Sequence, residues 1–445
     1  MKAALFLSTA LALLLASDGR AQEAPSTRLP DKVGEKQASD AQAGNEKKFP
    51  LKIHGFLLGD GAVRTTGERP LKGEGGDFVL GEGRLRLDIS GATGSGKGYL
   101  TVKGDVFYDA IAKEIDTDLR EGYAGYSRGP LDLRVGRQIV TWGVGDLFFI
   151  NDVFPKDWES FFSGRPMEYL KLGVDGVHIR YSGRSLNAEL AAVPFFKPDN
   201  LPSSRRFFFF DPFAAVPNQR EDEPAVSAAN TEIALRVYRR LADFDVSAYV
   251  YRGHWRTPGV RLDDPVSPRT ATRFYPQLSL YGASAQRGFF GGVLSLEAGY
   301  YDSRQDRSGD EPAIPNSQWR MLAGYQREMS QDFTAGVQVY GEIMSDYQGY
   351  RDSLPAGAPR QDRFRVVVST RLTRLLKYQT WTLSLFAAFS PTDNDYFLQP
   401  EVSHRVTDNL SASLGANVFG GSSETTFFGQ LTKSDNVFFR VRFDF

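Results

Sequence analysis

The sequence predicts an all-β protein: a transmembrane antiparallel up-and-down β-barrel of about 18 strands, with 16 as the alternative count. Three observations lead to this class. Segments of about ten residues alternate between apolar and polar side chains, the pattern of a strand with two unlike faces. The mean hydropathy is -0.34, as expected when a polar interior offsets an apolar outer wall. The connections between segments alternate between short and long, which is typical of such barrels.

The N-terminal residues predict export. Lys2 precedes an apolar run over residues 3–16, which is too short to cross a bilayer as a helix. We therefore expect a signal peptide over 1–21, a flexible polar leader in the periplasm over 22–48, and the barrel over 49–445. An even number of strands would place both termini on the periplasmic side of a bacterial outer membrane.

Composition excludes several classes of protein. The chain has no cysteine, so disulfides, a lipoprotein anchor and a covalently attached c-type haem are ruled out, and we expect no cofactor. The net charge of -1 argues against nucleic-acid binding, which requires a basic excess. The same balance predicts no strong ion selectivity.

The strand segments place charge on one face. In the clearest of them, Val79, Gly81, Gly83, Leu85, Leu87 and Ile89 share the apolar face. A charge that faces lipid near the midplane costs about 2–4 kcal/mol for Arg or Lys, so we expect the charged face to line the interior. The predicted lumen residues are Glu82, Arg84, Arg86, Asp88, Lys103, Asp105, Glu232, Arg236, Arg363, Arg365, Glu401, Arg405, Arg440 and Arg442.

Connections and aromatic positions complete the barrel pattern. Long polar loops are expected near 66–77, 110–118, 141–172, 194–229, 255–273, 304–316, 346–361 and 420–434, with a short exception near 391–394. Tyrosines near the strand ends are expected to form girdles at the membrane interfaces: Tyr108, Tyr181, Tyr249, Tyr251, Tyr300, Tyr301 and Tyr340.

The last strand has a strict alternation and ends on Phe445. Val437, Phe439, Val441, Phe443 and Phe445 point one way, and Phe438, Arg440, Arg442 and Asp444 point the other. Such an ending resembles the C-terminal signal of bacterial outer-membrane barrels. We therefore expect Phe439, Val441, Phe443 and Phe445 to act as an assembly signal for the barrel assembly machinery.

One long connection, near residues 142–171, mixes aromatic and charged side chains. Its Phe and Trp residues need burial, which an exposed loop would not provide, so we expect it to fold into the barrel and narrow the channel. An aromatic-rich external loop that packs on its neighbours is the alternative. The predicted constriction residues are Trp142, Asp146, Asn151, Asp152, Lys156, Asp157, Trp158, Glu159, Arg165, Glu168 and Lys171.

A second loop, over residues 194–230, contains a run of four phenylalanines at 207–210 among several prolines. Phenylalanine clusters of this kind indicate an interaction surface or a path for an apolar ligand. The alternative interpretation is that the run caps the mouth of the barrel.

The string Gly136-Arg137-Gln138, followed by Thr141-Trp142-Gly143, resembles a large, poorly characterised porin-like family of Gram-negative outer-membrane barrels. The ending from Phe427 to Phe445 is similar to theirs as well. This resemblance implies envelope carrier proteins of the periplasm and resistance-nodulation-division (RND) transporters as partners. It supplies no catalytic residues.

No pattern in the sequence indicates an enzyme or a metal site. The four histidines, His54, His178, His254 and His404, lie on separate segments without metal-ligand spacing. An acidic loop with Asp302, Asp306, Asp310 and Glu311 is either a Ca²⁺ site or simply solvated, and solvation is the commoner case.

The predicted function is therefore a porin-like outer-membrane channel for passive passage of small solutes through a lumen of mixed charge, embedded in lipid and lipopolysaccharide. One alternative is a barrel that passes lipid-like or hydrophobic molecules together with periplasmic or RND-type partners. Another is a structural sheath or docking barrel of an envelope complex, such as an electron conduit.

Overall fold

The computed structural model describes residues 50–68, 70 and 76–445. The predicted signal peptide (1–21) and leader (22–48) lie outside the described residues. No helix within this part of the chain is long and apolar enough to cross a membrane.

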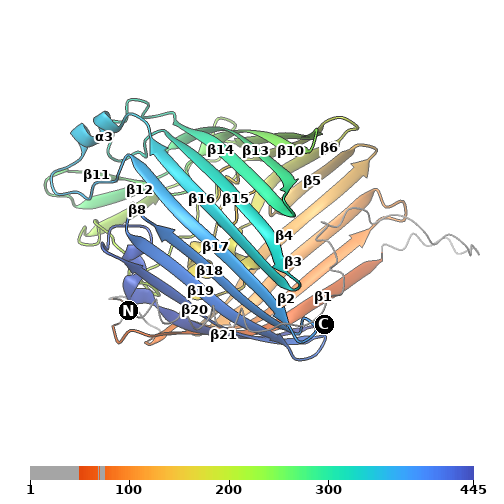
Figure 1. The fold of residues 1–445 in the computed structure, drawn as a ribbon. Helices are drawn as coiled ribbons and strands as arrows, with labels where there is room; N and C mark the ends of the chain where they lie inside the picture. Colours follow the sequence, from red (N-terminus) through yellow and green to blue (C-terminus); the bar gives the residue numbers. More distant parts are fainter. Residues whose placement is uncertain (1–49, 69, 71–75) are drawn as a thin grey trace, which may run out of the picture.

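Eighteen strands form one closed antiparallel sheet, so the predicted fold class and the count of 18 are confirmed (Figure 1). Each strand pairs with its neighbours in chain order, and the first strand closes the barrel against the last through the register from Phe56↔Asp444 to Arg64↔Asn436. The strands are β1 (Leu51–Arg64), β2 (Phe78–Ala92), β3 (Gly98–Asp109), β4 (Glu114–Arg128), β5 (Leu131–Gln138), β6 (Val174–Ser182), β7 (Asn187–Val193), β9 (Glu232–Leu241), β10 (Phe244–His254), β13 (Gln277–Phe289), β14 (Gly292–Ser303), β15 (Gln318–Ser330), β16 (Phe333–Met344), β17 (Phe364–Leu376), β18 (Trp381–Ser390), β19 (Asp395–Arg405), β20 (Leu410–Gly421) and β21 (Asn436–Asp444).

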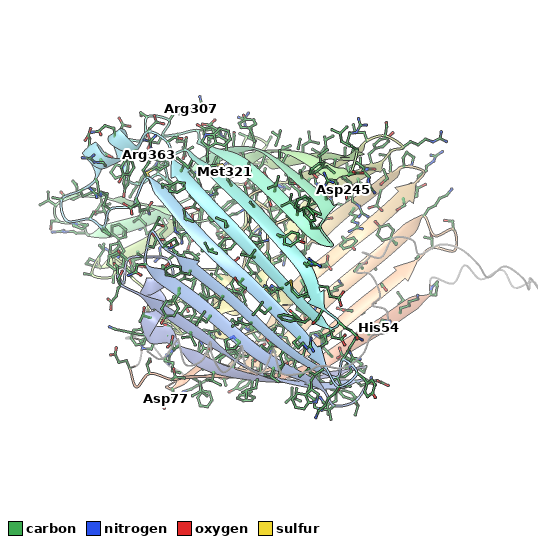
Figure 2. All side chains as sticks on the ribbon, in the orientation of Figure 1. His54, Asp77, Asp245, Arg307, Met321 and Arg363 are labelled. Atoms are coloured by element: carbon green, nitrogen blue, oxygen red, sulfur yellow. The ribbon has the colours of Figure 1, made fainter. Side chains whose placement is uncertain are left out.

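Short turns close one end of the barrel and most of the long connections lie at the other (Figure 1). The long-loop end carries a small sheet, β8 (Asn218–Asp222), β11 (Gly259–Leu262) and β12 (Thr270–Phe274), and two short helices, α3 (Tyr347–Ser353) and η2 (Gly429–Ser434). Two more short helices, α2 (Trp158–Ser163) and η1 (Met167–Leu170), lie in the connection between β5 and β6. Figure 2 shows Arg307 and Arg363 at this end, and His54 and Asp245 toward the end with the short turns.

The expected long loop near 110–118 is wrong. Only residues 110–113 connect β3 to β4, because β4 already begins at Glu114. Glu114 and Asp116 are exposed on this strand, which pairs with β3 as far as Asp109↔Glu114. These residues are polar because the strand continues to the rim of the barrel, where side chains are exposed to water, and the sheet is not interrupted there.

The outer wall is apolar, as the alternation predicts. On β21, Val437, Phe439, Val441 and Phe443 are exposed while the residues between them face inward. Val79 departs from the expected outward face of β2 and is fully buried. The register between β1 and β2 shifts at Ala62/Val63, and a shift of one residue turns a strand's side chains to the opposite face.

The expected interfacial girdle is wrong for four of the seven tyrosines. Tyr249, Tyr251, Tyr301 and Tyr340 are buried on the inner face, whereas Tyr108 and Tyr181 are exposed on the outer wall. The four inward tyrosines belong to a large apolar cluster together with residues of the connection between β5 and β6. The interior of the barrel therefore holds a packed core in addition to charged groups.

Candidate pore constriction and external vestibule

The connection between β5 and β6, residues 139–173, runs through the barrel interior; we call it the inward loop. Ile150, Phe154, Phe161, Phe162 and Leu170 in this loop are almost completely buried. Its polar groups bond to strands on all sides, from β2 through β7, β14 and β17 to β20 and β21. The loop thus crosses the space that the strands enclose.

Glu297 on β14 holds the first half of the inward loop. One carboxylate oxygen accepts the backbone N–H groups of Val144 (2.8 Å) and Gly145 (3.1 Å). The other accepts the backbone N–H and the side-chain amide of Asn151, both at 2.9 Å. A buried N–H group without a hydrogen-bond partner is costly. This part of the loop has no regular secondary structure, and the Glu297 carboxylate supplies the acceptor that these N–H groups would otherwise lack.

Two glycines make room for this contact. Gly282 and Gly299 face each other across β13 and β14. A Cβ atom on Gly282 would lie 1.8 Å from Oδ1 of Asn151, and one on Gly299 would lie 2.9 Å from Ile150. Between them the backbone of the loop reaches the wall itself, where the Tyr301 hydroxyl donates to the Ile150 carbonyl.

Further contacts bind the first half of the inward loop to other strands of the wall. Asp146 pairs with Arg371 on β17 (3.0 Å for the second of its two bonds), and its backbone N–H donates to Gln338 on β16 (3.0 Å). The indole N–H of Trp142 donates to Glu189 on β7 (3.1 Å).

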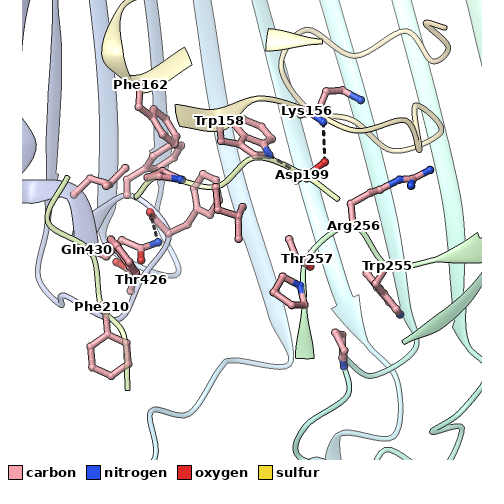
Figure 3. A pocket seen from close by; sticks show the side chains of 18 of the residues that line it. Lys156, Trp158, Phe162, Asp199, Phe210, Trp255, Arg256, Thr257, Thr426 and Gln430 are labelled. Atoms are coloured by element: carbon pink, nitrogen blue, oxygen red, sulfur yellow. Dashed lines mark hydrogen bonds between the residues drawn. The ribbon is translucent and has the colours of Figure 1, made fainter. Parts of the chain in front are cut away.

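The middle of the loop contains a buried charge cluster. Nζ of Lys156 lies 3.1 Å from the carboxylate of Asp152, which also pairs with Lys171 at 2.7 Å. Burial lowers the pKa of Lys156 and raises that of Asp199; Asp152 opposes the first shift and Lys156 the second. The backbone N–H of Lys156 donates to Asp199, which brings the connection between β7 and β9 against the inward loop (Figure 3).

The second half of the loop is held by ion pairs. Arg165 donates to Glu82 at 2.8 Å, and the other oxygen of Glu82 accepts from Arg84 at 2.5 Å. Arg84 and Arg86 both pair with Asp105 on β3. The network therefore joins the loop to two adjacent strands.

Tyr169 lies at the centre of three guanidinium groups. The guanidinium carbons of Arg84, Arg120 and Arg86 are 4.6, 4.9 and 5.4 Å from the centre of its ring. Arg86 also donates to the Tyr169 hydroxyl at 3.0 Å. Cations over an aromatic face stabilise this side of the loop in addition to the ion pairs that the same arginines make.

The short helix α2 and the residues next to it also bind the second half of the inward loop to the wall. The Asp157 carboxylate caps α2 by accepting the backbone N–H of Ser160 at 2.8 Å. The carbonyl of Phe162 accepts from the amides of Asn417 (2.9 Å) and Asn436 (3.2 Å) on β20 and β21. The remaining predicted loop residues have partners as well: Glu159 pairs with Arg206, Glu168 with Arg442, and Trp158 donates to Asp199.

Most of the predicted lumen residues lie on the inner face in ion pairs. Lys103 pairs with Glu121 (2.7 Å), Glu232 with Arg256 (2.8 Å), Arg236 with Glu189 (3.5 Å), Arg365 with Asp393 (2.5 Å) and Arg440 with Glu401. Asp88 is half-buried near the end of β2, and Arg405 is exposed at the end of β19.

Arg363 lies at the outer edge of the lumen and lines the cavity at its mouth. It precedes β17, which begins at Phe364, and its side chain is exposed at the mouth of the barrel. It has the same alternation phase as Arg365, so phase alone could not show that the strand begins between them.

Sequence reasoning missed several residues that hold the loop: Glu297, Glu189 and Arg371 on wall strands, and Arg256 in the connection after β10. Glu297 shares the phase of Ser295 and Gly299, against the exposed Leu296. The sequence did contain a signal for Glu297, which is a lone carboxylate on the inner face of an otherwise uncharged strand segment. Such a carboxylate has no partner in its own hairpin and therefore indicates an acceptor for a group from elsewhere in the chain.

Above the inward loop lies a cavity of about 1950 Å³, which we call the vestibule (Figure 3). Its floor includes Phe148, Phe149 and Trp158 of the loop, and the phenylalanine run 207–210 forms part of its side. Charged side chains of both signs line it in equal number: Lys156, Lys197, Arg256, Arg273, Arg320, Arg360, Arg363, Arg365 and Lys433 against Asp152, Asp199, Asp211, Glu221, Glu223, Glu342, Asp362, Asp393 and Glu424.

The histidines and the acidic loop have ordinary structural partners. His178 lies 3.2 Å from Glu189, and His404 stacks on Trp381. In the acidic loop, Asp302 pairs with Arg307 and Asp306 accepts the backbone N–H of Gly309. Within the described ranges, no three acidic or histidine side chains come together to hold a metal ion.

The closed sheet of 18 strands with long loops at one end defines the fold as that of an outer-membrane porin. OccK2 (OpdF) of Pseudomonas aeruginosa, solved in complex with glucuronate, has a TM-score of 0.55 at 10% identity over 88% of this chain and 97% of its own. OccD3 (OpdP) of the same organism has a TM-score of 0.54 at 8% identity (90% and 92% covered), and the outer membrane protein OprD, also from P. aeruginosa, 0.50 at 10% (89% and 92%).

Residues 112–394 match the family model described as "Protein of unknown function (DUF1302)", and the chain belongs to that family. No curated protein matches the sequence.

Proposed function

We propose that this protein is an outer-membrane channel for the passive passage of small solutes, and that the inward loop sets the width of the path. The fold it shares with OprD, an outer membrane protein, supports the location. Both ends of the closed sheet lie beside the short turns, so we place the two termini in the periplasm and the vestibule outside.

The observation that carries the proposal is the double attachment of the inward loop. Its first half binds Glu297 on β14, and its second half binds Glu82 on β2. A loop held on well-separated strands of a closed wall reduces the open cross-section, and it leaves a cavity on the side of the long connections.

Planar-bilayer conductance tests this proposal directly. We expect the purified protein to form channels, and replacement of residues 146–168 by a short Gly/Ser linker to raise single-channel conductance several-fold. The same linker in place of the exposed residues 263–268, between β11 and β12, is the matched control and should leave conductance unchanged. An unchanged conductance in the first variant would refute the constriction.

The charge balance supports a channel without strong ion selectivity. Nine basic and nine acidic side chains line the vestibule, so the net field over its mouth is small. We expect reversal potentials in a KCl gradient close to zero, and a marked preference for either ion would contradict this part of the proposal.

Of the two alternatives, the sheath has less support, because the chain's own loop fills the interior that a docked protein would need. Passage of hydrophobic molecules is favoured by one specific observation, the phenylalanine-rich lining of the vestibule. Co-purification of a periplasmic carrier or an RND-type transporter would favour that second function. We propose no catalytic role for any residue.

A further inference from the structure

The aromatic lining of the vestibule is dominated by phenylalanine. Fourteen phenylalanines, four tyrosines and two tryptophans surround the cavity. Phe210 and Phe427 are 40% and 42% exposed, although exposed apolar surface is unfavourable in a soluble region. A cluster of exposed rings around a cavity indicates a ligand that covers them.

The rings of the floor form two groups of contacts. Phe148 of the inward loop stacks on Tyr340, with 5.0 Å between ring centres. Trp158 contacts Phe149 (6.0 Å) and Phe427 (6.1 Å), both nearly edge to face. Stacked and edge-to-face arrangements are those that a further aromatic ring extends with favourable energy.

The polar atoms of these aromatic residues already have partners in the protein. The hydroxyls of Tyr251, Tyr275 and Tyr340 donate to the carboxylates of Glu232, Glu221 and Glu342. The indole N–H of Trp158 donates to Asp199 and that of Trp255 to Ser303. The Tyr301 hydroxyl donates to a carbonyl of the inward loop. These aromatic residues therefore offer a solute only ring faces and edges, which do not suit a solute such as a sugar that needs many hydrogen bonds.

Four charged groups on the wall of the vestibule next to Phe427 are likewise paired with each other. Glu342 lies 3.6 Å from Arg320 and 3.8 Å from Arg365, and Arg365 also pairs with Asp393. A charged solute that entered here would lose hydration without meeting an unpaired opposite charge on this wall. The arrangement therefore favours an uncharged solute.

From these contacts we propose that the vestibule binds uncharged compounds with an apolar aromatic ring, which stack on the floor beside Trp158 and Phe427 before passage. The inference rests on the proposed channel function and names the class of its substrate. A volume of about 1950 Å³ accommodates a ring of this kind with several-fold room to spare.

Two measurements test the inference with defined probes: benzyl alcohol, benzoate and glucose. In planar bilayers, we expect benzyl alcohol added on the vestibule side to cause brief current interruptions, at least tenfold more frequent than with benzoate or glucose at equal concentration. The double substitution Phe210→Ser/Phe427→Ser should abolish the excess. Phe195→Ser is the matched control, because Phe195 is an exposed phenylalanine of the same connection that does not line the cavity.

The second measurement does not require conduction. Bromine quenches indole fluorescence at short range, so 4-bromobenzyl alcohol should quench Trp158 and Trp255 saturably in the detergent-solubilised protein. The double variant should retain only the linear quenching caused by partition into detergent. Absence of any conductance would refute the channel and not the site. Linear quenching in the unaltered protein, or equal interruption by all three probes, would overturn the inference.

Discussion

The two halves of the inward loop are attached to the wall by different kinds of interaction. Residues 144–151 use backbone N–H groups, which converge on one carboxylate, Glu297, beside two glycines. Residues 165–171 use side-chain charges, which join a network with Glu82 and Arg84 and surround Tyr169 with guanidinium groups. One attachment depends on close approach of two backbones, and the other on long side chains.

Because of this difference, the two halves of the loop should tolerate different substitutions. The first attachment fails when volume is added at Gly282 or Gly299, because no side chain separates loop and strand at these two positions. The second fails when a charge loses its partner, because the network is buried and cannot recover solvent. The predictions below test this contrast, in order of decreasing effect.

The largest effect is expected for Arg165→Met. Removing one partner of a buried ion pair costs about 3–5 kcal/mol, and Glu82 keeps Arg84, so we expect the lower part of this range. The free energy of unfolding in detergent measures the loss. Arg180→Met is the control: its pair with Asp132 is partly exposed, and such pairs contribute about 0–1 kcal/mol. Equal losses in both variants would show that the second attachment is not a buried network.

The substitution Glu297→Gln should weaken the first attachment. One carboxylate oxygen becomes an N–H₂ donor that faces N–H groups, and each buried donor left without a partner costs about 1–3 kcal/mol. Hydrogen exchange at the backbone amides of Val144, Gly145 and Asn151 should accelerate. Ser295→Ala, on the same inner face of β14, should leave these amides protected, and protection in both variants would contradict the clamp.

Gly282→Ala probes the close approach itself. Its Cβ would overlap Asn151, and overpacking of this kind costs about 1–3 kcal/mol. We expect altered single-channel current together with faster exchange at Asn151. Gly288→Ala on the same strand, where no atom lies within 4 Å, should behave as the unaltered protein. If the two alanine variants were indistinguishable, the loop would not rest against this wall.

The smallest effect is expected for Arg371→Gln. Arg371 and Asp146 are 33% and 42% exposed, so their pair contributes about 0–1 kcal/mol. Raising the salt concentration to 1 M shortens the screening length to about 3 Å, and it should remove the difference between this variant and the unaltered protein. A loss that persists at high salt would mean that this pair belongs with the buried network.

The sequence alone predicted the barrel well, and the reason is local. Alternation along β21 depends only on which face of one strand meets lipid, so Val441 and Arg440 reveal it without knowledge of any neighbour. The same logic placed Glu82 and Arg84 on the inner face, and both residues are buried. It did not place Tyr301 and Tyr340, because an amphipathic ring suits both a membrane interface and a packed interior.

What the sequence determined by itself is the period of the strands, their approximate number and the separation of apolar from charged faces, since these follow from each residue and its nearest neighbours. Only the tertiary structure decided which groups meet inside. Glu297 lies 146 positions from Asn151, and Glu82 lies 83 from Arg165. Such pairs come together only when the first strand closes on the last, because closure sets the distance across the interior.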